Sequence, residues 1–468
     1  MKYDEITCLS AIEMQQLIQR KELSPVEVIE ACLEQVEHYN SKINAICTLN
    51  ERALDEARRL EQKFTKNKKM GLLYGLPVGI KDVTPVAGIR TTFGSTLYRD
   101  YVPEEDALIV HRLKEAGAII LGKTNTPEFA TGGNTFNEVF GRTRNPWNPE
   151  LSAGGSTGGG AAALASGMIA LAEGTDLGGS LRMPASFCGV VGLRPSPGLV
   201  PTYPSEFPWD TLSVTGPMAR TAEDAALMLQ AVSGPSPLSP VYQPTQGRDF
   251  VAAVNSAISK GTRMAYCRDI AGIGIDENIE RVCRQAAFDM TQAGITVEEI
   301  NLDLSFGWKP FLDLRGYWMV AQHYHHLDKI EQFGDNLKGN IEKGLKVTTE
   351  ELGAAEQARG KMWQLFQDFF QKYDYLLTPC MAVPPFPVEQ DYPATITGKT
   401  METYVDWFAP TFLLSLTSLP VASVPCGLDQ NGLPVGIQIV VPQTGEEKTL
   451  VLAKQMQDTH PIGLPSLG

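Results

Sequence analysis

The chain has 468 residues, with a hydrophobic fraction of 43% and a charged fraction of 20%, which are the proportions of a globular protein. Its net charge of −14, with no local Lys/Arg cluster, argues against nucleic acid as a direct partner. No basic segment with an apolar run opens the chain, and no apolar run approaches the roughly 18–20 residues of a membrane span. We therefore expect neither a signal peptide nor a membrane helix.

Eight cysteines are scattered along the chain, and no two of them form a CxxC pair. This spacing predicts neither a zinc site nor a redox motif. We expect reduced, mostly buried thiols in a cytoplasmic protein.

The N-terminal region, to about residue 69, is predicted to be helical. Ser24, Pro25 and Glu27 form a helix start, with serine at the cap, proline at the first helical position and glutamate three residues after the cap. Ser10 precedes an earlier short helix whose apolar residues recur at helical spacing.

From Tyr74 onward, short apolar runs alternate with helical stretches. We predict buried strands over residues 76–80, 118–121, 169–172, 190–193, 263–267, 296–299, 375–378, 422–427 and 435–440. We predict helices over residues 104–116, 161–165, 277–293 and 310–372, and a short one after Ser180. This alternation favours an α/β fold on a large, mostly buried sheet. The Pro/Ser-rich residues 233–244 are the best linker candidate, although strands on both sides of them could join one sheet.

Two serines, Ser156 and Ser180, lie in separate glycine-rich turns. Glycine lets the backbone bend sharply and lets a ligand approach its N–H groups closely. Acyl transfer needs a nucleophile, a base and donors for an oxyanion. Ser180 follows Asp176-Leu-Gly-Gly, where several N–H groups can point at one spot, so it is our candidate nucleophile. A plain helix cap is the alternative for Ser180.

A base for this chemistry could be a histidine or a lysine. None of the six histidines sits in a glycine-bounded turn beside a strand, and the cluster of three over residues 323–326 favours a solvated or pocket-lining role over metal binding. Lys81 leaves an apolar strand, where desolvation would lower its pKa toward use as a base. A surface turn of Lys81 and Asp82 is the alternative.

Two other interpretations of the glycine-rich turns are less favoured. Residues 154–158 match the GxSxG elbow of α/β-hydrolases, which would make Ser156 the nucleophile and require a downstream histidine. A phosphate cradle is disfavoured because no GK[ST] follows the glycines. A binding module without catalysis would leave the order of the motifs unexplained.

Three segments, in order, resemble the amidase signature family: Gly-Ile-Lys81-Asp82, Gly-Gly-Ser156-Thr-Gly-Gly and Gly-Thr-Asp176-Leu-Gly-Gly-Ser180-Leu-Arg182-Met-Pro. Residues 123–129, 145–148, 187–195 and 432–438 are also similar to family segments. The resemblance is dense over residues 72–202 and looser elsewhere. It implies an amidase-signature fold, with a large mixed twisted sheet covered by helices on both faces.

The resemblance also implies a Ser–cis-Ser–Lys triad. Ser180 would be the nucleophile, Ser156 the cis-serine that relays the proton and Lys81 the base, as in general base catalysis. Asp176 and Arg182 would brace the turn. The oxyanion hole would be the backbone N–H groups of Leu177, Gly178, Gly179 and Ser180. Thr157 departs from the family, which commonly has a second serine there, and its hydroxyl would still serve as a hydrogen-bond partner.

The implied activity is hydrolysis of a carboxylic amide to carboxylate plus ammonia or amine, through an acyl-enzyme on Ser180. The alternative is the ammonia-donating component of a tRNA-linked amidotransferase, which needs a charged clamp for glutamine, and Arg315 and Asp406 keep that alternative open. We expect an apolar or aromatic acyl group. The predicted pocket residues are Ala130, Thr131, Gly132, Gly133, Trp209 and Trp318, with Phe207 and Trp407 as further apolar walls.

We predict one amidase domain over residues 1–468, with a helical region to about 69, a signature core over about 72–202 and a C-terminal part of the same sheet over about 260–460. No metal, nucleotide or flavin is implied. As partners we expect a small-molecule amide, no direct nucleic acid and no membrane, and a homodimer stays open.

Overall fold

Eleven strands form one mixed sheet in this computed structural model, which describes residues 2–63 and 70–467. Their spatial order is β1-β3-β2-β8-β10-β9-β16-β17-β13-β11-β12. The strands are β1 (Ile46–Leu49), β2 (Pro77–Lys81), β3 (Ile119–Thr124), β8 (Leu171–Asp176), β9 (Val191–Arg194), β10 (Val214–Ala219), β11 (Arg263–Tyr266), β12 (Thr296–Glu299), β13 (Tyr375–Pro379), β16 (Val421–Leu428) and β17 (Pro434–Val440). Small hairpins pair β4 (Phe136–Asn137) with β5 (Gly141–Arg142), β6 (Arg144–Asn145) with β7 (Asn148–Ser152), and β14 (Thr395–Ile396) with β15 (Lys399–Thr400).

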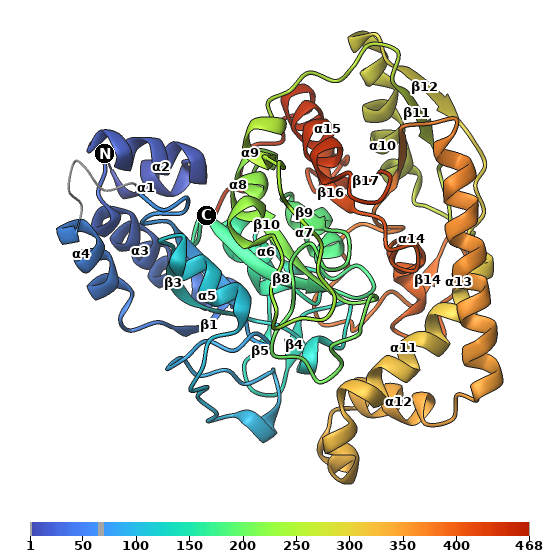
Figure 1. The fold of residues 1–468 in the computed structure, drawn as a ribbon, viewed down its shortest axis with the longest axis horizontal. Helices are drawn as coiled ribbons and strands as arrows, with labels where there is room; N and C mark the ends of the chain where they lie inside the picture. The colour runs from blue at the N-terminus through green and yellow to red at the C-terminus, as the bar shows by residue number, and fades with distance from the viewer. Residues whose placement is uncertain (1, 64–69, 468) are drawn as a thin grey trace.

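Helices cover both faces of the sheet and its two ends. In Figure 1 the N-terminal helices gather at the left end, and α10 and α13 lie at the right end. The α-helices are α1 (Tyr3–Cys8), α2 (Ala11–Arg20), α3 (Pro25–Ile43), α4 (Ala53–Lys63), α5 (Leu108–Glu115), α6 (Gly158–Ala165), α7 (Arg182–Cys188), α8 (Ala222–Val232), α9 (Phe250–Ala253), α10 (Glu277–Asp289), α11 (Trp308–Gln322), α12 (Asp335–Gly344), α13 (Thr349–Phe370), α14 (Ala409–Ser415) and α15 (Glu446–Thr459).

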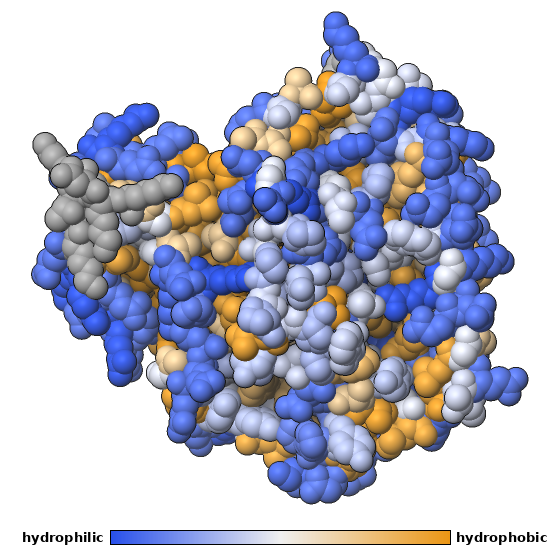
Figure 2. Space-filling view, viewed as in Figure 1, coloured by the Kyte–Doolittle hydropathy of each residue, from blue (hydrophilic) through white to orange (hydrophobic). Residues whose placement is uncertain are grey.

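Strand β3 shows how the two faces are filled. Side chains alternate between the faces of a strand. Ile119 and Leu121 pack into a hydrophobic cluster with α3 and α6, whereas Ile120 packs into the larger cluster with α5 and α8. The sheet is therefore buried on both sides, and Figure 2 shows hydrophilic residues along most of the outer rim of the molecule.

Most of the predicted elements are confirmed, with shifted ends. Ser24 caps α3 through a capping box, in which its Oγ accepts from the Glu27 N–H at 3.1 Å and Glu27 Oε2 accepts from the Ser24 N–H at 2.8 Å. Ser10 caps α2 in the same way. The helix predicted from residue 104 begins at Leu108, because Asp106 instead accepts the N–H of Ala87 at 2.8 Å.

The prediction missed several elements, and one shifted end lies at the site. The strand predicted over 169–172 extends to Asp176. The turn that contains Ser180 therefore follows the strand directly. The region predicted to be helical contains the edge strand β1, and its residues 64–69 lie outside the described residues. Strand β10 and helices α8, α14 and α15 were not predicted at all.

Strands from both sides of residues 233–244 share the sheet, where β9 pairs with β16. That the chain forms a single domain stays a prediction. No helix within residues 2–63 and 70–467 is both long and apolar enough to cross a bilayer.

The pairing of β2 with β8 positions the site. The two strands are parallel neighbours, with Val78 opposite Leu171 and Gly79 opposite Ala172. Their carboxyl ends therefore emerge at one edge. Lys81 ends β2 there, and Thr175 and Asp176 end β8.

Candidate active site

Lys81 and Ser156 meet at this edge of the sheet. The Nζ atom of Lys81 lies 2.7 Å from Ser156 Oγ. Ser156 lies in the loop between β7 and α6, and the peptide bond between Gly155 and Ser156 is cis, as the family resemblance implies. Helix α6 packs closely against the backbone at Asn125 because it begins with glycines. A Cβ at Gly159 would lie 2.3 Å from the Asn125 backbone nitrogen.

Two threonines complete the surroundings of the Lys81 amine. Its Nζ lies 3.0 Å from Thr157 Oγ1 and 2.9 Å from Thr175 Oγ1. Thr157 Oγ1 in turn lies 3.5 Å from the carbonyl oxygen of Thr175, to which its hydroxyl donates. The three side-chain contacts of Nζ are thus all to hydroxyl groups.

Burial decides the protonation of Lys81. Its side chain is fully buried, which lowers the pKa of Lys81 from 10.5 to about 7, although the charges of Glu173 and Asp176 act to raise it. The amine is therefore about half uncharged near neutral pH and largely uncharged above it. The alternative of an exposed Lys81–Asp82 turn is wrong, because both residues are buried.

A second buried charge network lies directly behind Lys81. The Glu173 carboxylate accepts the backbone N–H of Lys81 at 3.0 Å and the Thr84 hydroxyl at 2.9 Å. Lys123, also fully buried, donates to the carbonyl of Thr84. Burial lowers the pKa of Lys123 and raises that of Glu173. Sequence reasoning did not single out this pair.

Ser180 lies between β8 and α7 and is partly exposed. Its carbonyl accepts the N–H of Thr157 at 3.2 Å, which joins the two glycine-rich turns. The side chains of Ser156, Thr175 and Ser180 line one cavity of about 50 Å³. Ser180 is not the cap of α7, since the cap position is Leu181 and has no side-chain bond.

The turn from Asp176 to Ser180 exposes backbone donors. Leu177 and Gly178 line the cavity with Ser180, and the N–H groups of these three residues have no hydrogen-bond acceptor among the described residues. The Gly179 N–H differs, because it donates to Asp176 Oδ1 at 2.8 Å. Gly179 has a φ of +130°, and a Cβ there would lie 2.3 Å from Thr411 Oγ1, so only glycine fits.

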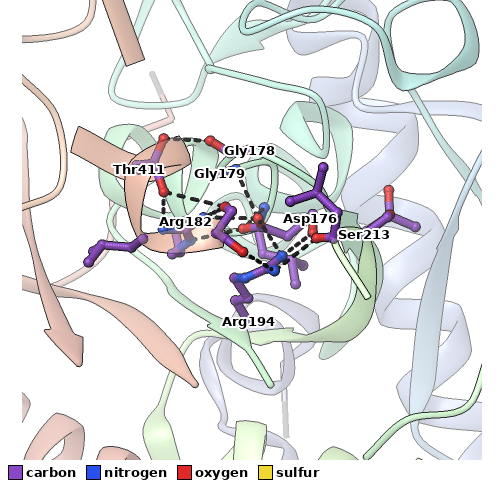
Figure 3. A network of polar contacts seen from close by, with 12 residues as sticks. Asp176, Gly178, Gly179, Arg182, Arg194, Ser213 and Thr411 are labelled. Atoms are coloured by element: carbon purple, nitrogen blue, oxygen red, sulfur yellow. Dashed lines mark hydrogen bonds and ion pairs between the residues drawn. The ribbon is translucent and has the colours of Figure 1, made fainter. Parts of the chain in front are cut away.

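Asp176 is the centre of the network that holds this turn (Figure 3). Its carboxylate accepts both Nε and an Nη of Arg182 at 3.0 Å and lies 3.3 Å from Arg194. Burial alone would raise the pKa of Asp176, but the two guanidinium charges outweigh it and lower the pKa to about 2. Arg182 also donates to the Thr411 carbonyl at 2.8 Å, which ties the turn to α14.

Three of the six predicted pocket residues line the cavity: Ala130, Gly132 and Trp318. Thr131 and Gly133 are buried and do not line it, and Gly133 is so close to the Trp407 ring that a Cβ would come within 2.7 Å. The prediction for Trp209 has no support, because its side chain is 72% exposed and lies outside the cavity wall.

Several lining residues were not predicted. Arg315 is one of them, because the sequence predicts it only as half of a possible glutamine clamp. The others are Thr175, Met183, Ser213, Met319 and Phe408, whereas Phe129 begins the segment over residues 129–133 that the sequence predicts to face the substrate. Arg315, Trp318 and Met319 share α11, and this helical spacing was the one available signal.

The other half of the clamp is not assembled. Asp406 accepts the Thr403 N–H at 2.8 Å and the Thr403 hydroxyl at 3.0 Å, within its own loop, and does not line the cavity. The histidine cluster does not form a metal site either, and no group of metal-ligating side chains occurs among the residues that the structure covers.

Comparisons with known proteins agree on one family. The family model described as Amidase matches residues 27–450. An acylamidase of Rhodococcus erythropolis is 34% identical over 461 residues, which cover 97% of this chain and 96% of that protein. The A subunit of the glutamyl-tRNA(Gln) amidotransferase from Carboxydothermus hydrogenoformans is 35% identical over 464 residues, covering 93% and 94%.

Solved structures show the same likeness. A bacterial aryl acylamidase of the amidase signature family superimposes with a TM-score of 0.90 at 26% identity, over 97% of each chain. A 6-aminohexanoate cyclic dimer hydrolase gives a TM-score of 0.85 at 26% identity, over 98% of this chain and 99% of that one. The chain therefore belongs to the Amidase family and is a hydrolase that acts on the C–N bonds of carboxylic amides.

Proposed function

We propose that this amidase works by acyl transfer on Ser180, with Ser156 as the proton relay and Lys81 as the base. The observation that carries the proposal is the buried Lys81 amine at 2.7 Å from Ser156, which lines one cavity together with Ser180. A neutral amine has two N–H donors and one lone pair. It donates to Thr157 and Thr175 and accepts from the Ser156 hydroxyl, which matches its three contacts.

The steps follow from this arrangement. The Ser180 oxygen attacks the carbonyl carbon and gives its proton to Ser156, whose own proton passes to Lys81. The N–H groups of Leu177, Gly178 and Ser180 stabilise the oxyanion of the tetrahedral intermediate. The Gly179 N–H, already bound to Asp176, instead maintains the turn.

The intermediate then collapses. The C–N bond breaks and the relay returns the proton to the leaving nitrogen, which departs as ammonia or amine and leaves an ester on Ser180. Water attacks this ester and gives a proton to the same relay. The bond between the acyl carbon and the Ser180 oxygen then breaks, the relay returns that proton to Ser180, and the acid loses its remaining proton to solvent and leaves as the carboxylate. Asp176 and Arg182 are structural in this scheme, because they touch the turn and not the reacting atoms.

For the substrate we propose a small-molecule amide with a short apolar segment next to the scissile carbonyl. Its support is the cavity of about 50 Å³, whose wall includes Phe129, Met183, Trp318 and Phe408. We favour an amidase that acts alone over an amidotransferase component, because Asp406 is bound within its own loop and supplies no second half of a clamp.

The experiment assays the isolated chain against primary, N-substituted, aryl and cyclic amides and follows ammonia or amine release. Ser180→Ala is expected to abolish turnover with an unchanged circular dichroism spectrum, whereas the exposed Ser256→Ala is the matched control with normal turnover. A serine-directed phosphonate should label Ser180 alone. Full turnover by Ser180→Ala, or labelling of another serine, would show that the nucleophile is misassigned.

A further inference from the structure

Arg315 lines both the catalytic cavity and a second, larger one. Its side chain comes from α11 and is only 5% exposed. The second cavity has a volume of about 240 Å³, and its wall also includes Asn340, Lys343 and Lys346. We call this second cavity the outer cavity.

The guanidinium of Arg315 has no anionic partner. It donates to Asn340 Oδ1 and, at 2.8 Å, to the Tyr404 hydroxyl, and no carboxylate in residues 2–63 or 70–467 lies within ion-pair distance of it. Arginine has five N–H donors, so three stay available. Asn340 offers no second acceptor to these three donors. Its Oδ1 already accepts from Arg315, and its Nδ2 donates to Asn336 and Tyr404.

The outer cavity carries further positive charge, and no carboxylate of the described residues pairs with it. Lys343 and Lys346 form no ion pair within the described part of the chain. The two acids on the wall, Asp313 and Glu351, both bind Lys309, at 2.8 and 2.9 Å. A chain with a net charge of −14 therefore presents a locally cationic wall beside its active site.

A buried guanidinium without a counter-ion is costly, and a carboxylate in bidentate contact is the group that satisfies it best. We propose that the substrate is an amide that carries a carboxylate, which binds Arg315 while the scissile carbonyl lies at Ser180. Asp406 is occupied by Thr403, so no matching acid receives an α-ammonium group, and the site fits a simple carboxylic acid better than an amino acid. This inference rests on the proposed function.

The experiment compares charged amides with uncharged partners of the same shape. Succinamate, glutaramate and adipamate are assayed against succinamide, glutaramide and adipamide, and N-acetyl-β-alanine against N-propylacetamide. The three chain lengths locate the carboxylate, and the last pair places it on the amine side. The measured quantity is the ratio of kcat/KM, charged over neutral, for the best pair.

We expect wild-type enzyme to favour the charged partner. Arg315→Met should lower that ratio roughly 10- to 100-fold, the usual effect of losing a hydrogen bond to a charged group. Arg315→Lys should restore part of it, because it keeps the charge but loses the planar donors. Arg359→Met is the matched control. Arg359 donates to Leu416, Thr211 and Ser418 and lines neither cavity. The ratio of kcat/KM, charged over neutral, for Arg359→Met should therefore equal that of the wild type.

The outcomes separate the two proposals. A wild-type ratio near one in every pair, or a ratio that Arg315→Met leaves unchanged, overturns the carboxylate site while turnover through Ser180 stands. Loss of the proposed function would instead appear as full activity of Ser180→Ala. Thermal unfolding of Arg315→Met, followed by circular dichroism, shows whether the variant is folded, and the ratio on the surviving enzyme is independent of the amount of folded protein.

Discussion

Lys81 is a base only while its amine is uncharged. Its pKa is lowered from 10.5 to about 7 by burial, so protonation increases as the pH falls below that value. We predict that kcat/KM for an uncharged amide rises with pH through about 7 and then levels off. Steady-state rates from pH 5 to 9 test this, and a steady fall above pH 7 would contradict it. Lys81→Met should lower kcat/KM by at least about 10²-fold.

Glu173 offers a control on this interpretation. Its charge raises the pKa of Lys81, so removing it lowers that pKa further. Glu173→Gln should therefore move the midpoint of the pH profile to lower pH, whereas a merely structural role would change the rate and leave the midpoint in place.

Thr157 shows how a departure from the family pattern is accommodated. Its hydroxyl lies 3.0 Å from Lys81 Nζ, and its methyl group fills space beside Gly174, where a Cβ would lie 2.6 Å from it. We predict that Thr157→Val, which keeps the shape and loses the hydroxyl, lowers kcat roughly 10-fold, as expected for one lost hydrogen bond near 1.5 kcal/mol.

Thr157→Ser is the matched variant, because it keeps the hydroxyl and removes only the methyl group. It should retain kcat within about threefold and lose about 1 kcal/mol of unfolding free energy. Equal kcat values for the two variants would show that the hydroxyl does not position Lys81.

At the level of elements, the Asp176 network joins β8, β9, α7 and α14. Arg182 is fully buried and has four partners on or beside these elements: Asp176, Thr411, Ser415 and Gln438. We predict that Arg182→Met lowers the unfolding free energy by about 3–5 kcal/mol, because it leaves Asp176 buried with one guanidinium partner fewer. Urea unfolding measures this loss.

Arg284→Met provides the comparison for that measurement. Arg284 also bonds a carboxylate, that of Glu299 at 2.9 Å, but both side chains are largely exposed. Its loss should cost no more than about 1 kcal/mol, since solvent screens exposed ion pairs. Similar losses for the two variants would mean that the Asp176 network contributes little to stability.

Across the whole molecule, the sheet is continuous through the strand pair β9–β16. Val421 lies opposite Arg194, and Ala422 opposite Leu193, so the N-terminal and C-terminal strands share hydrogen bonds. We predict one cooperative unfolding transition in urea, with the same midpoint by far-ultraviolet circular dichroism and by tryptophan fluorescence. Two separate midpoints would indicate that residues on either side of 233–244 unfold as independent domains.

The sequence by itself determined the local features. Ser24 caps its helix as predicted, because a cap depends on residues three positions apart, and the short helix predicted after Ser10 is present. The α/β class followed from apolar runs of strand length between helical stretches. The three candidate catalytic residues came from the resemblance of spaced motifs to the amidase signature family, and the contact between Lys81 and Ser156 agrees with them.

Only the tertiary structure decided which distant residues meet. Arg315, Asn340 and Tyr404 come from separate segments and converge beside the cavity, whereas Trp209 faces solvent and Asp406 bonds to its own loop. Strand β10 was also not predicted from the sequence. It contains a glycine and a proline, and both of these positions pair with β8. The physical reason is that periodicity and capping are encoded by neighbours in the chain. The burial and the partners of a side chain depend instead on how the whole sheet is assembled.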